Sequence, residues 1–222
     1  MNALKIDGIS KYYERDGNTI CVIDNFSLHI KENEHVCIVG KSGVGKTTLA
    51  KIICGIEKVD KGKVDVCGYD PRQLLKINRK QYSKMIHYIS QDAYLSFDPL
   101  YSMLQSLVEV VRIHEQHISV VDCTTKIKKL IRTARMDDLL ECLDKRPHQM
   151  SGGQLQRFAV IRMLLISPEI IVADEPTAML DEDNTRRISD IFEHTLKNKT
   201  LVYITHNMVL ADSLGDKRIC LA

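Results

Sequence analysis

The sequence predicts an α/β protein with a mainly parallel β-sheet, an antiparallel β part near the N-terminus and an inserted helical subdomain. Three observations lead to this prediction. The runs 35–39, 170–173 and 201–205 are almost wholly apolar, which is typical of strands covered on both faces. The turn signal Asp16-Gly17-Asn18 indicates an antiparallel ribbon. Between residues 92 and 167 strand signals give way to helical spacing.

The elements follow in chain order. We expect strands over residues 19–23, 35–39, 63–67, 85–89, 170–173 and 201–205. In the insertion, apolar residues recur at helical spacing in two sets: Leu104, Leu107, Val108 and Val111, then Ile127, Leu130, Ile131 and Ala134. We therefore expect one domain over 1–222. Its α/β core comprises 1–91 and 168–222 with the antiparallel part near 1–35, and its helical subdomain comprises 92–167.

Composition narrows the classes of function. The chain has 222 residues, 44% of them hydrophobic, and its formal net charge is only +2, so no broad basic surface for nucleic acid is expected. No apolar run approaches the roughly 20 residues that span a bilayer, and the first residues lack the pattern of a secretion signal. The seven cysteines include no Cys-x-x-Cys pair, which indicates reduced core thiols.

A phosphate-binding loop follows the apolar run that ends at Val39. Residues 40–47 fit the pattern G-x-x-x-x-G-K-[ST], with a strand before them and a helix-like segment after them. Glycines let the loop turn its N–H groups towards phosphate oxygens, and the helix directs its positive end at the same anion. The candidate nucleotide-binding residues are Gly40, Lys41, Ser42, Gly43, Val44, Gly45, Lys46, Thr47 and Thr48. Lys46 would bridge the outer phosphates, and the Thr47 hydroxyl would ligate Mg²⁺.

A pair of acids, Asp174-Glu175, ends the apolar run 170–173. Because side chains alternate along a strand, the two carboxylates cannot serve one ligand in the same way. We assign Asp174 to Mg²⁺ and Glu175 to the general base that acts on an attacking water. The alternative is a solvated strand end, which the phosphate loop makes the weaker interpretation.

The segment Ser151-Gly152-Gly153-Gln154 opens an apolar-periodic stretch and precedes Asp174-Glu175. Serine is a common helix N-cap, so a plain cap is the alternative interpretation. Following a phosphate loop, however, this order of motifs makes the chain resemble the ATP-binding cassette (ABC) ATPases over essentially its whole length. The resemblance implies a P-loop NTPase (RecA-like) core, hydrolysis of ATP with Mg²⁺, and an active site shared between two subunits.

The resemblance also assigns roles to single residues. Tyr13, with Tyr12 as a neighbouring candidate, would stack on adenine, and Gln91 would touch Mg²⁺ and the attacking water. Ser151, Gly152, Gly153 and Gln154 would contact the γ-phosphate of ATP held by the opposite subunit. Residues 178–181 would form the loop through which the subunits sense each other, and His206 would contact the γ-phosphate.

The segment 91–100 resembles that of ATPases in peptide and nickel importers. This implies a subunit at the cytoplasmic face of the cell membrane, partnered by a second ABC ATPase (identical or related), by membrane permease subunits and by an extracellular solute-binding protein. A groove near Gln91–Tyr101, with Tyr94, Phe97 and Leu100, would receive the permease; alternatively these three are core residues of the insertion.

Three positions depart from the family pattern: Met150 replaces leucine, Ala178 replaces serine, and Asn207 replaces aspartate. The stretch His114-Glu115-Gln116-His117 lacks the spacing of a zinc motif and is interpreted as a solvated helix face. Three other functions remain open: an exporter ATPase, a soluble ABC protein acting on ribosomes or DNA, and a non-catalytic regulatory cassette.

Overall fold

The computed structural model describes residues 2–221, which fall into two compact units. Unit 1 contains the chain up to Tyr88, Glu169–Glu175 and the chain from Leu196 onward, and unit 2 contains Ile89–Pro168 and Pro176–Thr195. The division predicted from the sequence kept 176–195 in the core, whereas the structure groups this segment with the helices. The reason is local packing, because Met179 and Leu180 lie against Gly152 and Gly153.

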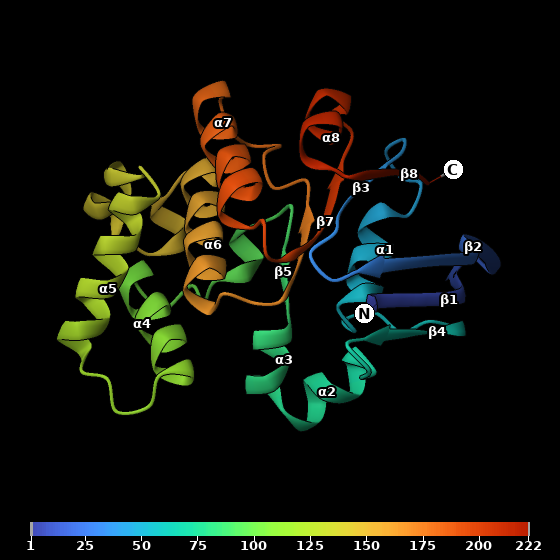
Figure 1. The fold of residues 1–222 in the computed structure, drawn as a ribbon, viewed down its shortest axis with the longest axis horizontal. Helices are drawn as coiled ribbons and strands as arrows, with labels where there is room; N and C mark the ends of the chain where they lie inside the picture. Colours follow the sequence, from blue (N-terminus) through green and yellow to red (C-terminus); the bar gives the residue numbers. More distant parts are fainter. Residues whose placement is uncertain (1, 222) are drawn as a thin grey trace. The chain divides into compact units, whose positions relative to one another are not determined.

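A three-stranded antiparallel sheet in unit 1 contains the predicted ribbon. Strands β1 (Asn2–Arg15), β2 (Asn18–Lys31) and β4 (Lys61–Val66) are arranged in the order β2-β1-β4 (Figure 1). The two turn residues between β1 and β2, Asp16 and Gly17, both have positive φ (52° and 77°), as the tight turn of a twisted hairpin requires. Leu4, Ile6 and Ile9 of β1 are fully buried. The prediction of an antiparallel part is confirmed.

A five-stranded sheet forms the centre of the α/β core. Its strands are β3 (His35–Val39), β5 (Ile86–Ile89), β6 (Ile170–Asp174), β7 (Thr200–Thr205) and β8 (Lys217–Cys220), in the order β5-β6-β7-β3-β8. The pairs β6–β7, β3–β7 and β3–β8 are parallel. Every residue of β6 and β7 is buried, which confirms the prediction from their apolar runs. Strand β8 was not predicted.

Helices of unit 1 follow β3, β4 and β7. They are α1 (Lys46–Ile53), α2 (Pro71–Ile77), α3 (Arg79–Met85) and α8 (Met208–Leu214). Helix α1 directly continues the loop after β3, and α8 precedes β8. This strand–loop–helix connection is what places the phosphate-binding loop at the carboxyl end of β3.

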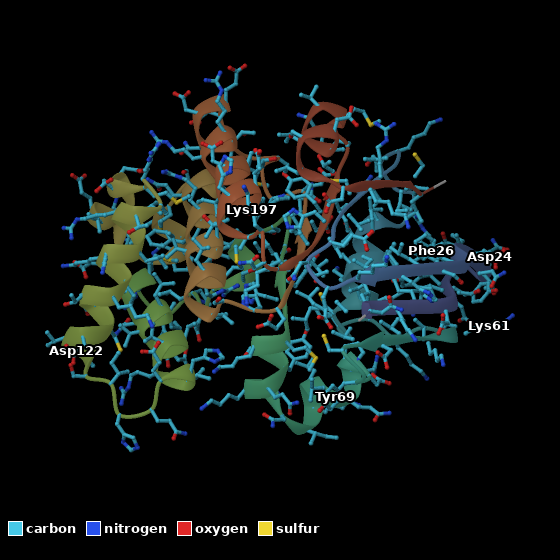
Figure 2. All side chains as sticks on the ribbon, viewed as in Figure 1. Asp24, Phe26, Lys61, Tyr69, Asp122 and Lys197 are labelled. Atoms are coloured by element: carbon cyan, nitrogen blue, oxygen red, sulfur yellow. The ribbon has the colours of Figure 1, made fainter. Side chains whose placement is uncertain are left out.

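Unit 2 is helical, as predicted for the insertion. Its helices are α4 (Met103–His114), α5 (Val120–Thr133), α6 (Gly152–Ile166) and α7 (Glu182–Asp190), with α4, α5 and α6 packed together (Figure 1). Short 3₁₀ turns lie at Tyr94–Ser96, Asp137–Cys142 and Pro147–Gln149, and one π turn lies at Ile191–Thr195. Asp122, in the first turn of α5, points away from the packed helices (Figure 2).

Three further expectations can be compared with the structure. All seven cysteines are free, but Cys21, Cys67 and Cys220 are exposed, so the prediction of core thiols is wrong for these three. Among residues 2–221 no helix is long and apolar enough to cross a bilayer. The same residues contain no cluster of three His, Cys, Asp or Glu side chains suited to a metal; α4 ends at His114, and His117 lies beyond it with a φ of 70°.

Candidate active site

The phosphate-binding loop has the backbone conformation that its glycines allow. Gly43 and Gly45 have φ of 82° and 101°, in the left-handed region that side chains disfavour. A Cβ at Gly45 would also lie 2.8 Å from Val22 Cγ1, so no larger residue fits there. Gly45 is the N-cap of α1 and has no side chain to cap it, so the first N–H groups of the helix remain available to an anion.

Lys46 is buried and turned back on the loop. Its Nζ donates hydrogen bonds to the carbonyl oxygens of Gly40 (2.8 Å) and Lys41 (2.9 Å). The ammonium group is thus held at the mouth of the loop by two neutral acceptors. Phosphate oxygens are stronger acceptors for an ammonium group than carbonyls are, so the arrangement holds this charge ready for an anion.

Asp174 lies at the end of β6, only 1% exposed. Its carboxylate accepts a hydrogen bond from Tyr88 Oη at 3.0 Å, and the Thr47 side chain also bonds to it. Burial raises the pKa of Asp174, and the bonds from Thr47 and Tyr88 offset only part of that increase. The structure therefore brings together Thr47 and Asp174, the two residues that the sequence assigned to Mg²⁺.

The chemistry of these donors fits Mg²⁺. A threonine hydroxyl and a carboxylate are hard oxygen ligands, and Mg²⁺ is commonly bound by one or two such protein groups with water and phosphate oxygens completing the shell. A buried, partly uncompensated carboxylate beside a hydroxyl is the arrangement that a divalent cation would stabilise. Thr47 and Asp174 are accordingly the residues that would hold the ion.

Glu175 and His206 form a second pair in the same unit. His206 Nδ1 lies 3.0 Å from Glu175 Oε2, within hydrogen-bonding distance. Glu175 has a φ of 47°, which is unusual for a residue other than glycine. Its N–H donates to Ile204 O at 2.9 Å. The Glu175 carboxylate contacts His206, whereas the buried Asp174 carboxylate contacts Tyr88, so the two adjacent acids have different partners.

The candidate adenine-stacking residue, Tyr13, is 38% exposed near the end of β1. Lys11 Nζ lies 4.9 Å from the centre of its ring, and the same ammonium pairs with Glu57 at 2.9 Å. Tyr12 is instead half-buried, with Lys61 Nζ 5.7 Å from its ring; Figure 2 shows Lys61 at the start of β4. Of the two candidates, Tyr13 offers the larger exposed ring surface.

The segment 151–154 forms the start of α6 in unit 2. Ser151 is the N-cap: its Oγ accepts from Gln154 N at 3.2 Å, and Gln154 Oε1 accepts from Ser151 N at 3.0 Å, a complete capping box. The two glycines have close neighbours, since a Cβ at Gly152 would lie 2.9 Å from Met179 Sδ. Ser151 is therefore a helix N-cap, as the alternative interpretation held. Both glycine residues also line a hollow.

This hollow of about 330 Å³ lies wholly within unit 2. It is lined by Ser151–Gln154, Arg157, residues 179–181 and Asn184. Arg157 is buried and pairs with Asp138 through two nitrogens, at 2.8 and 2.7 Å. Asp181 caps α7 by accepting from Asn184 N, and this bond lowers the pKa of Asp181. The structure thus joins the predicted signature segment to the predicted sensing loop 178–181.

Gln91 belongs to unit 2, where it is exposed directly after Ser90. Its predicted contacts with Mg²⁺ and water remain a prediction. The three apolar residues after it divide: Phe97 is buried, whereas Tyr94 and Leu100 are exposed. The core interpretation therefore holds for Phe97 alone, and Tyr94 and Leu100 remain available on the surface.

The departures at Asn207 and Ala178 leave the local structure intact. Asn207 Oδ1 accepts from Val209 N (3.0 Å) and Leu210 N (3.2 Å) and so caps α8, as an aspartate would. Ala178 lies in the turn before α7, next to the exposed Met179.

Sequence reasoning missed one residue of the site, Tyr88, and one contact, that between Met179 and Gly152. Tyr88 contacts Asp174 only because β5 lies beside β6 in the sheet, and no spacing in the sequence indicates that neighbour. Met179 covers Gly152, and the only available signal was a large apolar side chain inside the predicted sensing loop.

Comparison with known proteins agrees with this geometry. Residues 23–178 match the family described as ABC transporter. The nickel import ATP-binding protein NikE of Escherichia coli K12 is 32% identical over 186 residues, which cover 82% of this chain and 68% of that protein. The energy-coupling factor transporter ATP-binding protein EcfA1 of Mycoplasmopsis synoviae is 33% identical over 220 residues, covering 95% and 77%.

A solved structure is similar over nearly the whole chain. The dimeric post-hydrolysis state of the ATP-binding cassette MJ0796, bound to ADP and Pi, matches with a TM-score of 0.88 and 28% identity, covering 98% of this chain and 94% of that one. A family match over most of the chain, together with this structural similarity and the ordered phosphate loop, acids and capping box, shows that the chain belongs to the ABC transporter family.

Proposed function

We propose that the chain is the ATP-hydrolysing subunit, at the cytoplasmic face of the membrane, of a bacterial ABC importer of the dipeptide, oligopeptide or nickel type. The observation that carries the proposal is the grouping of Thr47 with Asp174 and of Glu175 with His206 in one unit that also holds the phosphate-binding loop. Similarity to NikE, and to the oligopeptide transport protein OppF of Haemophilus influenzae at 26% identity, supports the importer type.

Binding begins at the loop. The N–H groups of residues 40–47 and of the start of α1 would surround the phosphates of ATP. Lys46 would exchange the carbonyls of Gly40 and Lys41 for phosphate oxygens, a change of acceptor that needs little movement of its buried stem. Tyr13 would stack its exposed ring face on the adenine.

Hydrolysis would use the second pair of residues. Glu175 would accept a proton from the attacking water, and His206, at 3.0 Å from that carboxylate, would orient it and contact the γ-phosphate. Thr47 and Asp174 would hold Mg²⁺, whose charge would offset the charge that develops on the phosphate oxygens. Gln91 would help to orient the water.

The active site would be completed by a second subunit, identical or related. Its residues Ser151–Gln154 would present the N–H groups of an α6 N-terminus to the γ-phosphate, so that ATP joins the two subunits and hydrolysis releases them. Closure would be passed to permease subunits seated on the exposed side chains of Tyr94, Leu95, Leu100 and Tyr101. A solute-binding protein outside the cell would deliver the cargo.

A variant that binds ATP but cannot hydrolyse it tests this proposal. We expect Glu175→Gln to form a dimer with Mg-ATP and to remain monomeric with Mg-ADP, as measured by size-exclusion chromatography with light scattering. Phosphate release should fall by roughly 10²–10⁴-fold, the usual contribution of a general base. Glu109→Gln, which changes an exposed glutamate of α4, is the matched control. A variant that stays monomeric with ATP would contradict the assignment of Glu175.

The importer type needs a separate test. We expect the chain to co-purify with permease subunits encoded beside its gene, and the reconstituted complex to take up labelled nickel or dipeptide only with ATP present. Outward transport by the same vesicles would favour an exporter, and tight binding to ribosomes or DNA at physiological salt would favour the soluble class.

A further inference from the structure

The segment that carries Gln91 has little regular structure of its own. Strand β5 ends at Ile89, and the next ordered turn is the 3₁₀ turn Tyr94–Ser96. Within it, Asp92 Oδ1 accepts from Tyr94 N at 3.0 Å, and Ser96 N donates to Ala93 O at 3.0 Å. These bonds fold the turn but do not fix it to the rest of unit 2.

Two polar side chains of α6, the buried Gln156 and the half-buried Arg162, strengthen the attachment that the buried Phe97 also provides. Gln156, 1% exposed, donates from Nε2 to Ser90 O at 3.2 Å. Arg162 donates from Nη1 to Ser96 O, and its guanidinium lies 4.6 Å from the centre of the Phe97 ring. One contact therefore precedes Gln91 in the chain and the other follows it, and both come from the same helix.

Neither side chain is well satisfied by these contacts. Gln156 Oε1 and Arg162 Nε are buried without a hydrogen-bond partner. Burial lowers the pKa of Arg162 to about 10, and no carboxylate among residues 2–221 forms an ion pair with it. A methionine or leucine would fill the same space without desolvating a charge. Only polar side chains can form the hydrogen bonds to Ser90 O and Ser96 O, and apolar replacements would lose them.

We propose that Gln156 and Arg162 are positioning residues that hold both flanks of the Gln91 segment to α6. This inference rests on the proposed function, because it gives Gln91 a role in hydrolysis. Helix α6 is also the element whose N-terminus Ser151 caps. A shift of α6 as a unit at Ser151–Gln154 would carry Gln156 and Arg162 with it, and through their bonds to Ser90 O and Ser96 O would move Gln91.

The same attachment reaches the exposed apolar side chains. Tyr94 and Leu95 belong to the 3₁₀ turn whose last carbonyl Arg162 holds. A partner that presses on these side chains would shift the turn, and Arg162 would transmit that shift to α6. The two residues thus connect the surface proposed for the permease with the segment proposed to contact the second subunit, entirely within unit 2.

The test compares Gln156→Leu and Arg162→Met with Met163→Leu, a fully buried apolar control on the same helix. Hydrogen exchange followed by mass spectrometry should show the amides of residues 91–97 exchanging about tenfold faster in each test variant, which is the effect of losing one hydrogen bond. Exchange in residues 40–53 should not change. Arg162→Lys, which keeps a cationic donor, should restore part of the protection and serves if Arg162→Met does not fold.

Activity supplies the second readout. With Mg-ATP at protein concentrations that allow dimers, we expect kcat to fall about tenfold while the affinity for a fluorescent ATP analogue stays within about twofold, because the phosphate loop is untouched. Unchanged exchange in 91–97, or an equal increase in Met163→Leu, would overturn the proposal. The exchange measurements do not depend on hydrolysis. Failure of the proposed function would instead appear as a wild-type chain that does not hydrolyse ATP, so the two failures can be told apart.

Discussion

At the scale of single residues, Asp174 has the burial and charge that suit its proposed role as a magnesium ligand. Its carboxylate is almost fully buried, and two hydroxyl donors compensate only part of its lost hydration, so its pKa is raised. At pH values between the pKa of Asp174 in the unfolded chain and its higher pKa in the folded chain, the folded state binds more protons. The stability that Asp174 contributes therefore decreases as pH rises through that interval, and the full penalty is present above it.

We accordingly predict opposite effects of Asp174→Asn on stability and activity. Removing the buried charge should raise the melting temperature by roughly 2–4 °C, equivalent to about 1 kcal/mol in a chain of this size. Phosphate release with Mg-ATP should fall by roughly 10²–10³-fold. Differential scanning calorimetry and a phosphate assay measure the two effects. Asp144→Asn, at an exposed position, should change neither; a destabilised Asp174→Asn would show that the charge is already compensated.

At the scale of elements, α8 depends on the cap that Asn207 provides, since one side-chain oxygen serves two N–H groups. We predict that Asn207→Ala lowers the free energy of unfolding by about 1 kcal/mol and that Asn207→Asp leaves it nearly unchanged. Urea unfolding curves measure both. Equal loss in the two variants would mean that the amide nitrogen, and not the capping oxygen, matters at this position.

The sequence was sufficient for the elements with strong patterns. The apolar runs of β6 and β7 and the helical spacing around Leu107 and Ile127 predicted those elements correctly, because burial on one or both faces leaves a periodic signal. Strand β8 gave no such signal. Its sequence, Lys217-Arg218-Ile219-Cys220, is mostly exposed, and it becomes a strand through its pairing with β3.

The residues of the candidate site divide in the same way, into those that stand in a sequence motif and those that do not. Lys46, Thr47, Asp174, Glu175 and His206 stand in short motifs, so their types and order could be read directly, and the structure places them in one unit. Tyr88 and Arg162 could not be found in this way. Their contacts join residues far apart in the chain, and such pairs depend on how strands and helices pack.

At the scale of the whole molecule, burial separates the seven cysteines into two groups. Cys37, Cys54, Cys123 and Cys142 are buried, and burial raises the pKa of Cys37 to about 11, so its thiol stays protonated at pH 8. We predict that N-ethylmaleimide at pH 8 modifies Cys21 and Cys220 first and Cys67 more slowly, because burial also raises the pKa of Cys67. The four buried thiols should react only after unfolding.

Mass spectrometry of the intact and digested protein measures the order of modification. Rapid modification of Cys37 or Cys54 in the native protein would mean that the five-stranded sheet or α1 opens locally, and would contradict the packing described above. Loss of ATP binding after modification of Cys21 alone would place that thiol close to the nucleotide, since Cys21 pairs with Tyr12 across the hairpin.

The lysine behind Tyr13 has a consequence for which bases the protein accepts. Burial disfavours the charged form of Lys11, but its bond to Glu57 and the nearby Asp60 outweigh this and raise its pKa, so a full positive charge stays on one side of the phenol. In the proposed stacking role of Tyr13, a purine would bind to the ring face opposite Lys11. The Lys11 charge draws electron density from the Tyr13 ring, which should favour stacking of electron-rich adenine over electron-poor bases. Replacing Lys11 with methionine should therefore narrow the difference in affinity between ATP and other nucleoside triphosphates.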